Sequence, residues 1–108
     1  MSRLKIVTYV PVDHCDKVRE ALGEAGAGVI GEYRYCSFSV TGTGRYIPSV
    51  DAKPFIGTSG QLEKVTEERI EVVCERADAQ KILTALRSAH PYEEVAVDIY
   101  ELLGENDL

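Results

Sequence analysis

The feature of this sequence that most constrains its fold is the order in which two hydrophobic periodicities follow one another. Residues 4–10 alternate between apolar and more polar side chains, which predicts a β-strand, and Pro11 closes it. Apolar residues then recur at helical spacing, so one helical face carries Cys15, Val18, Leu22 and Ala25. We expect Asp13 to cap this helix, and Gly26 and Gly28 to end it.

Alternation of period two then returns twice before the next helical pattern. Residues 32–41 predict a second strand, with Tyr33 and Tyr35 on one face and Cys36 on the other. Residues 61–75 regain the alternation and predict a third strand.

A second helix and a fourth strand complete the series. Asp78 is placed to cap a helix whose apolar face consists of Ile82, Leu86 and Ala89, and residues 95–99 alternate again. The order strand, helix, strand, strand, helix, strand is that of the ferredoxin-like βαββαβ split arrangement. This α+β fold has a four-stranded antiparallel sheet in the order 4-1-3-2, with both helices on one face. A length of 108 residues suits a single domain spanning 1–108.

In this topology three connections lie at the same end of the sheet. They are residues 10–15, 42–60 and 90–94. We therefore expect four side chains that are far apart in the sequence to form one rim, which is a candidate ligand site: His14, His90, Tyr92 and Glu93.

The stretch His-Pro-Tyr-Glu-Glu at 90–94 allows three interpretations. It can be a structural helix stop, because Pro91 cannot continue a helix and a histidine suits the last turn. It can belong to a ligand site, in which His14, His90 and Glu93 are donors of the types that a divalent metal ion uses. It can also supply a histidine and a carboxylate for general acid and base catalysis.

The glycine-rich segment 42–60 is longer than most loops inside a small domain. Gly42 and Gly44 can offer backbone N–H groups to an anion, yet Gly-Thr-Gly precedes no helix and lacks the spacing of a dinucleotide or phosphate loop. The favoured interpretation is a flap that packs Phe55 and Ile56 over the sheet or against a neighbouring subunit.

The net charge and the cysteine content limit the classes of binding partner and the cellular compartment that we expect. A formal charge of −6 repels phosphate backbones, so nucleic acid is not an expected partner. No apolar run reaches the roughly 18 residues of a membrane span, and the N-terminus lacks a signal pattern, so we expect a cytoplasmic protein without a membrane partner. The three cysteines, Cys15, Cys36 and Cys74, have no Cys-x-x-Cys pairing and are expected to be reduced and buried.

Several motifs, in this order, resemble the YqfO-type domain. They include V-P-V-D-H at 10–14, P-F-I-G at 54–57 and H-P-Y-E-E-V-A-V-D-I-Y at 90–100, and the resemblance spans residues 3–103. That domain occurs alone or as an insertion in the dinuclear-metal-centre family related to the NGG-one-interacting factor three. The resemblance implies a shape like that of the CutA and PII trimers. The metal ions of the larger family are held by flanking domains, so neither metal ligands nor hydrolase activity is carried over to this chain.

Two functional hypotheses follow. The first is a non-catalytic oligomeric binding or regulatory module that takes a small ligand, a divalent metal ion or a protein partner at the rim. The second is a metal-dependent hydrolase, or an accessory subunit of one; it ranks lower because a hydrolytic metal site needs at least three protein donors and the chain has two histidines. By analogy with CutA and PII we expect a homotrimer, with a dimer as the alternative, in which a neighbour covers a sheet face carrying Val7, Tyr9, Tyr33 and Tyr35.

Overall fold

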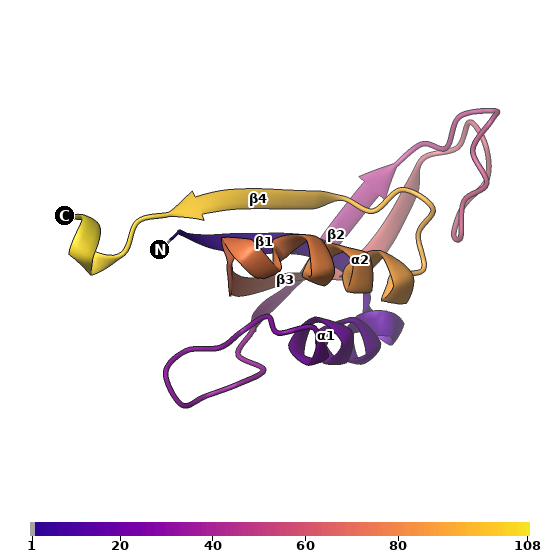
Figure 1. Cartoon of the computed structure of the whole chain (residues 1–108). Helices are drawn as coiled ribbons and strands as arrows, with labels where there is room; N and C mark the ends of the chain where they lie inside the picture. The colour runs from indigo at the N-terminus through magenta and orange to yellow at the C-terminus, as the bar shows by residue number, and fades with distance from the viewer. Residues whose placement is uncertain (1) are drawn as a thin grey trace.

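The structure, a computed structural model, describes residues 2–108 as one sheet with two α-helices and three short 3₁₀ turns (Figure 1). The strands are β1 (Arg3–Pro11), β2 (Phe38–Tyr46), β3 (Glu63–Glu75) and β4 (Val97–Leu102). The helices are α1 (Cys15–Glu24) and α2 (Ala79–Ala89), and the 3₁₀ turns are η1 (Val12–His14), η2 (Arg76–Asp78) and η3 (Glu105–Asp107). This is the predicted order of elements, and the fold class is confirmed.

The four strands form an antiparallel sheet in the order β2-β3-β1-β4, as the split arrangement predicts. Strand β1 lies inside the sheet, where Val7 is paired with Glu71 of β3 on one side and with Asp98 of β4 on the other. Strands β2 and β4 are the two edges. Both helices pack on one face of the sheet (Figure 1), so the opposite face, which we call the open face, is left without a covering layer of helices.

The hydrophobic core lies between the helices and the sheet. Alternate residues of β1 and β3 point into it because successive side chains of a strand face opposite sides. The strands contribute Leu4, Ile6, Val10, Ile70, Val72 and Cys74, and the helices contribute Cys15, Val18, Leu22, Ile82, Leu83 and Leu86. The helical faces that the sequence predicts are therefore the faces that are buried, except that Ala25 is only partly buried.

The predicted second strand was misplaced. It was expected over residues 32–41, but β2 begins at Phe38 and continues through the glycine-rich stretch to Tyr46. Residues 30–33 instead form a tight turn closed by an Ile30–Tyr33 bridge, with positive φ at Gly31. Tyr35 also has a positive φ of 59°, which interrupts extended backbone before Phe38. From Phe38 to Tyr46, β2 pairs with residues Glu71 to Glu63 of β3, and this pairing includes Gly42 and Gly44 in the sheet.

Three smaller predictions also need correction. Asp13 lies within η1, and neither Asp13 nor Asp78 makes a side-chain capping hydrogen bond, although Asp78 does occupy the N-cap position of α2. Cys36 is only half-buried, whereas Cys15 and Cys74 are buried as expected. Tyr33 and Tyr35 are both exposed and lie outside the sheet, so they do not belong to its open face.

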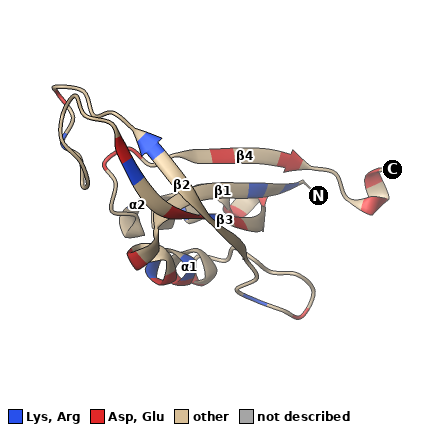
Figure 2. Ribbon diagram, turned by 180° about the vertical axis from the view of Figure 1, so that it is seen from behind, with Lys and Arg blue, Asp and Glu red and all other residues tan. Residues whose placement is uncertain are grey.

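The open face carries charged side chains among its apolar ones. Figure 2 shows acidic and basic segments on strands of the sheet seen from behind. Lys5 and Arg69 both form ion pairs with Glu71 on this face, at 3.1 and 3.0 Å. Within residues 2–108, neither helix has the length and apolar character needed to cross a membrane.

Candidate functional site

The three connections predicted to share one end of the sheet do lie together (Figure 1). The ring of His14, from η1, packs edge-on against Phe55 of the β2–β3 connection, with centroids 5.2 Å apart. Phe55 in turn lies 6.5 Å from the ring of Tyr92, and Tyr92 lies 5.0 Å from His90. An aromatic chain therefore joins all three connections.

His90 ends helix α2 and also ties it to the sheet. Its backbone is extended, with ψ at 136°, and its N–H still donates to the carbonyl of Leu86, so the predicted helix stop is confirmed. Its Nε2 lies 2.7 Å from the carbonyl oxygen of Tyr9, and its Nδ1 accepts a hydrogen bond from the N–H of Tyr92 at 3.1 Å. Burial lowers the pKa of His90, which favours the neutral ring that these two bonds require. Both ring nitrogens thus serve the local structure.

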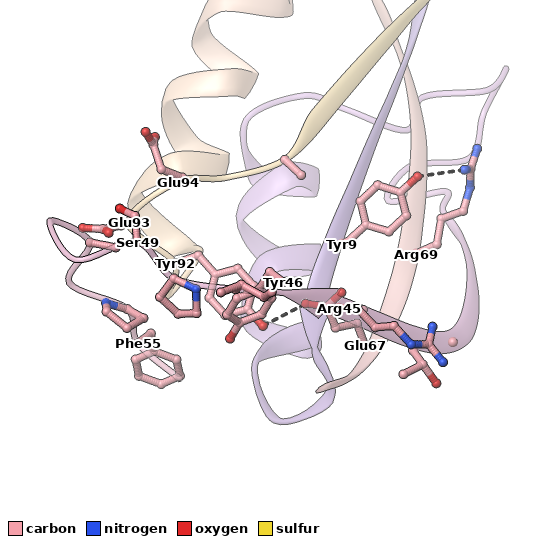
Figure 3. A pocket seen from close by; sticks show the side chains of 18 of the residues that line it. Tyr9, Arg45, Tyr46, Ser49, Phe55, Glu67, Arg69, Tyr92, Glu93 and Glu94 are labelled. Atoms are coloured by element: carbon pink, nitrogen blue, oxygen red, sulfur yellow. Dashed lines mark hydrogen bonds between the residues drawn. The ribbon is translucent and has the colours of Figure 1, made fainter. Parts of the chain in front are cut away.

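Beside this aromatic chain lies an open pocket of about 810 Å³. Its walls come from strand β2, from the connection that follows it, from β3 and from the segment after α2. Figure 3 shows the side chains that line the pocket, including Tyr46, Phe55, Glu67, Tyr92 and Glu93. Of the predicted site residues, four line this pocket: Gly42, Gly44, Tyr92 and Glu93. His14 and His90 do not line it, but their rings contact those of Phe55 and Tyr92, which do.

A buried carboxylate forms one wall of the pocket. Glu67 is only 8% exposed, and its Oε2 accepts a hydrogen bond from the hydroxyl of Tyr92 at 2.8 Å (Figure 3). Gly44 makes room for this carboxylate, since a Cβ added there would lie 2.0 Å from Oε1 of Glu67. Burial raises the pKa of Tyr92, and the hydrogen bond to Glu67 raises it further, so Tyr92 remains a protonated donor.

Two tyrosines fix the orientation of the aromatic side of the pocket. The ring of Tyr46 meets that of Tyr92 at 5.9 Å and 68°, and its hydroxyl donates to the carbonyl of Ile56 at 2.7 Å. This bond holds the β2–β3 connection against the end of β2. The segment predicted as a flap, residues 42–60, is shorter in the structure, because residues 42–46 belong to β2. The connection that remains, residues 47–62, is called the flap here, and its Phe55 packs on His14 and Tyr92 but is still 52% exposed.

Two of the three predicted metal donors, His90 and Glu93, are engaged by backbone groups, whereas the buried Nδ1 of His14 has no hydrogen-bond partner among the described residues. Both ring nitrogens of His90 are engaged by the backbone, and Oε1 of Glu93 accepts a hydrogen bond from the N–H of Lys53 at 2.8 Å. Across residues 2–108 no three His, Cys, Asp or Glu side chains gather as a metal site would require.

Sequence reasoning missed Glu67, Tyr46 and Arg45. Glu67 sits within Thr-Glu-Glu-Arg, and the alternation of the sequence assigns its side chain to one face of β3. The alternation does not show that the glycines of the neighbouring strand, β2, lie beside it. In the register of the sheet, Gly42 of β2 is the direct partner of Glu67 of β3. A glycine paired with a glutamate on the adjacent strand indicates open space beside the carboxylate, and this pairing would have pointed to the pocket. That signal requires the register, which only the structure supplies.

Comparison with known proteins agrees with this fold, although no family model matches the chain. The chain is 47% identical over 106 residues to a GTP cyclohydrolase 1 type 2 homolog of Halalkalibacterium halodurans. The aligned region covers 98% of this chain and 28% of that protein. The crystal structure of a Bacillus cereus protein related to NIF3 superposes with a TM-score of 0.81 at 46% identity, over 94% of this chain and 26% of that one.

A smaller protein shares the fold over most of its length. CutA1 from Shewanella sp. SIB1 has a TM-score of 0.69 at 19% identity, over 94% of this chain and 82% of that one. The chain thus spans about a quarter of the longer relatives but 82% of this CutA1 chain. The chain is therefore a homologue of one domain of the NIF3-related proteins, a domain with the CutA-like fold.

Proposed function

We propose that this chain is a non-catalytic, self-associating module that binds a small organic ligand in the pocket between β2, the flap and residues 92–96. The observation that carries the proposal is the pocket itself, about 810 Å³ in volume, because that size suits a small ligand. Its lining fits the same role, since aromatic rings surround a few fixed polar groups such as Glu67 and the hydroxyl of Tyr92.

Self-association is supported by the open face and its edges. Phe38 and Val40 of edge strand β2 are 65% and 51% exposed, and Tyr100 of edge strand β4 is 44% exposed. Exposed apolar side chains next to unpaired strand edges are features that proteins cover with a partner. Tyr9, Val40 and Arg69 of this face also line the pocket, so a second copy seated on the face would cover that part of it. We propose a trimer, with a dimer as the alternative, acting in the cytoplasm.

The pocket offers binding groups without a catalytic pair. Its buried acid, Glu67, is bonded to a tyrosine whose raised pKa keeps it protonated, and His90 uses its two ring nitrogens on backbone groups. Among the described residues, the group within hydrogen-bond distance of Glu67 is the hydroxyl of Tyr92, and its raised pKa makes it a hydrogen-bond donor rather than a base or nucleophile.

One observation supports the alternative, an accessory domain of a metal-dependent hydrolase. The longer relatives carry about three quarters of their length beyond the segment that this chain matches. In that case the metal ligands would belong to the remaining part, and this chain would contribute binding and assembly.

Native mass spectrometry of protein purified without added metal tests the proposal. We expect an oligomer that retains, or takes up from a mixture of small aromatic compounds, one ligand for each subunit. A monomer near 11.9 kDa that takes up none of these compounds would contradict the proposal.

A further inference from the structure

The carboxylate of Glu67 is the least expected group in the pocket. It is 8% exposed, and burying a carboxylate costs free energy unless hydrogen bonds or a cation compensate. Within residues 2–108, the hydroxyl of Tyr92 is the one hydrogen-bond donor found for it, and the ion pairs of the chain involve other acids. One of its oxygens, Oε1, therefore has no donor or cation among these residues.

The space next to this carboxylate is accessible to a ligand. Gly42 lies directly opposite Glu67 in the sheet, and a Cβ added to Gly42 would meet no heavy atom within 4 Å. Gly42 and Gly44 both line the pocket. A ligand can thus lie flat on the β2 backbone and reach the edge of the carboxylate.

The rest of the lining selects a flat group. The ring of Tyr92 lies between two others, with its centroid 5.9 Å from that of Tyr46 and 6.5 Å from that of Phe55. Aromatic faces bind apolar rings and also attract cations. The pocket thus combines a stacking surface with a negative charge at its inner wall.

Charge around the pocket favours a cation over an anion. Three acids line it, Glu67, Glu93 and Glu94, against two bases, Arg45 and Arg69. Arg69 is already engaged, since its Nε pairs with Glu71 at 3.0 Å and its Nη1 donates to the hydroxyl of Tyr9 at 3.1 Å. Arg45 is exposed, so solvent screens its charge more than that of the buried carboxylate.

We propose that the pocket selects small molecules in which a flat aromatic ring carries a cationic nitrogen donor, such as an amidinium or a protonated amine, with Glu67 as the counter-ion. The inference rests on the proposed function, because it names the ligand class of the same pocket. A charge-assisted hydrogen bond from the ligand to Oε1 would supply the donor that the protein does not, and Tyr92 would hold Oε2 in place.

Three probes of the same shape test this selectivity. Benzamidine carries an amidinium, benzamide is neutral and benzoate is an anion. Binding is followed from the backbone amide signals of Gly42, Gly44 and Tyr92 in NMR titrations of the whole chain in its native oligomeric state. We expect benzamidine to bind at least about tenfold more tightly than benzoate, the ratio that one charge-assisted hydrogen bond provides.

Two variants and a control connect the preference to Glu67. Glu67→Gln should reduce the ratio of the benzamidine and benzoate affinities to within about threefold, because it removes the charge and keeps the shape. Gly42→Val fills the open space beside Glu67 on an edge strand and should weaken all three probes. Glu20→Gln makes the same charge change on an exposed position of α1 and should leave the ratio unchanged. Dispersed amide signals show that each variant is folded.

The outcomes separate the inference from the proposed function. If benzoate binds as tightly as benzamidine, or if Glu67→Gln keeps the wild-type ratio, the pocket binds ligands but the selectivity for cations is wrong. If none of the three probes shifts the pocket amides and Gly42→Val behaves like the wild type, both proposals are wrong.

Discussion

The Nε2 atom of His90 lies 2.7 Å from the carbonyl oxygen of Tyr9, so the ring donates a hydrogen bond from the end of helix α2 to strand β1. The Nδ1 atom of the same ring accepts from the N–H of Tyr92 at 3.1 Å. Only the neutral tautomer with its proton on Nε2 makes both bonds. This buried histidine thereby positions Tyr92, whose hydroxyl holds Glu67 in the pocket.

We predict that acidification destabilises the fold through His90. Burial lowers its pKa below the ordinary value of 6.5, so the unfolded chain takes up this proton at a higher pH than the folded chain. The free energy of unfolding should be insensitive to His90 above about pH 6.5. Below that pH it should fall by at most about 1.4 kcal/mol per pH unit. Urea denaturation between pH 7.5 and 5 measures the slope.

The His90→Gln variant is expected to be less stable at pH 7.5 and to lose this part of the slope. His14→Asn serves as the matched control because it removes the other histidine and leaves the bonds to Tyr9 and Tyr92 intact. A slope that is the same in His90→Gln and in the wild type would show that other groups cause the pH dependence.

Thiol reactivity should distinguish the three cysteines. Burial raises the pKa of Cys15 and of Cys74, and both side chains are shielded in the core, so neither forms the reactive thiolate readily. Cys36 is half-buried in the connection before β2. With a disulfide reagent at pH 8, we expect one fast thiol per chain and two that react on unfolding. Cys36→Ser should abolish the fast phase; a fast phase that persists would place the accessible thiol elsewhere.

Assembly through the open face can be tested by one charge on strand β2. Phe38 is 65% exposed and lies opposite Glu71 in the register, so Phe38→Glu places an acid beside an acid on the surface that a neighbour would cover. A stable interface buries roughly 800 Å² per partner and does not tolerate an unpaired charge at its centre. Light scattering coupled to size exclusion should show smaller species for this variant.

Tyr33→Glu is the matched control for this assembly test. Tyr33 is 75% exposed, but it lies in the turn closed by Ile30, outside the sheet. This variant should keep the mass of the wild type. If Tyr33→Glu dissociates the oligomer and Phe38→Glu does not, the interface includes the turn at residues 30–33 in place of the open face.

Gly28 is a position where a methyl group should be costly. Its φ is 82°, and an added Cβ would lie 2.3 Å from the carbonyl oxygen of Cys36. Its N–H also donates to Val73 at 2.7 Å, so the backbone is held in place by β3. We expect Gly28→Ala to lower the free energy of unfolding by about 2 kcal/mol or more. Gly42→Ala, with an open surrounding and no positive φ, should change it by less than about 0.5 kcal/mol.

The sequence by itself determined the order of the elements and the faces of the helices. Val18 and Leu22 of α1, like Ile82 and Leu86 of α2, recur at the spacing of a helical turn, and all four are buried. Such patterns are local, because one helical turn or two strand residues suffice to display them. The topology followed from that order, and with it the prediction that residues near His14, the β2–β3 connection and His90 share one end of the sheet.

Only the tertiary structure decided where β2 begins and what the pocket contains. The alternation at Tyr33 and Tyr35 is as regular as that of a strand, yet β2 pairs with β3 only from Phe38 onward. Beyond that pair the carbonyl of Val73 in β3 accepts a hydrogen bond from Gly28, and a turn interrupts the backbone at residues 30–33. In the same way, nothing adjacent to Glu67 in the sequence reveals that Gly44 leaves room for its carboxylate or that Tyr92 donates to it. Strand register and buried polar contacts depend on residues far apart in the chain, and therefore on the free energy of the whole fold rather than on a local pattern.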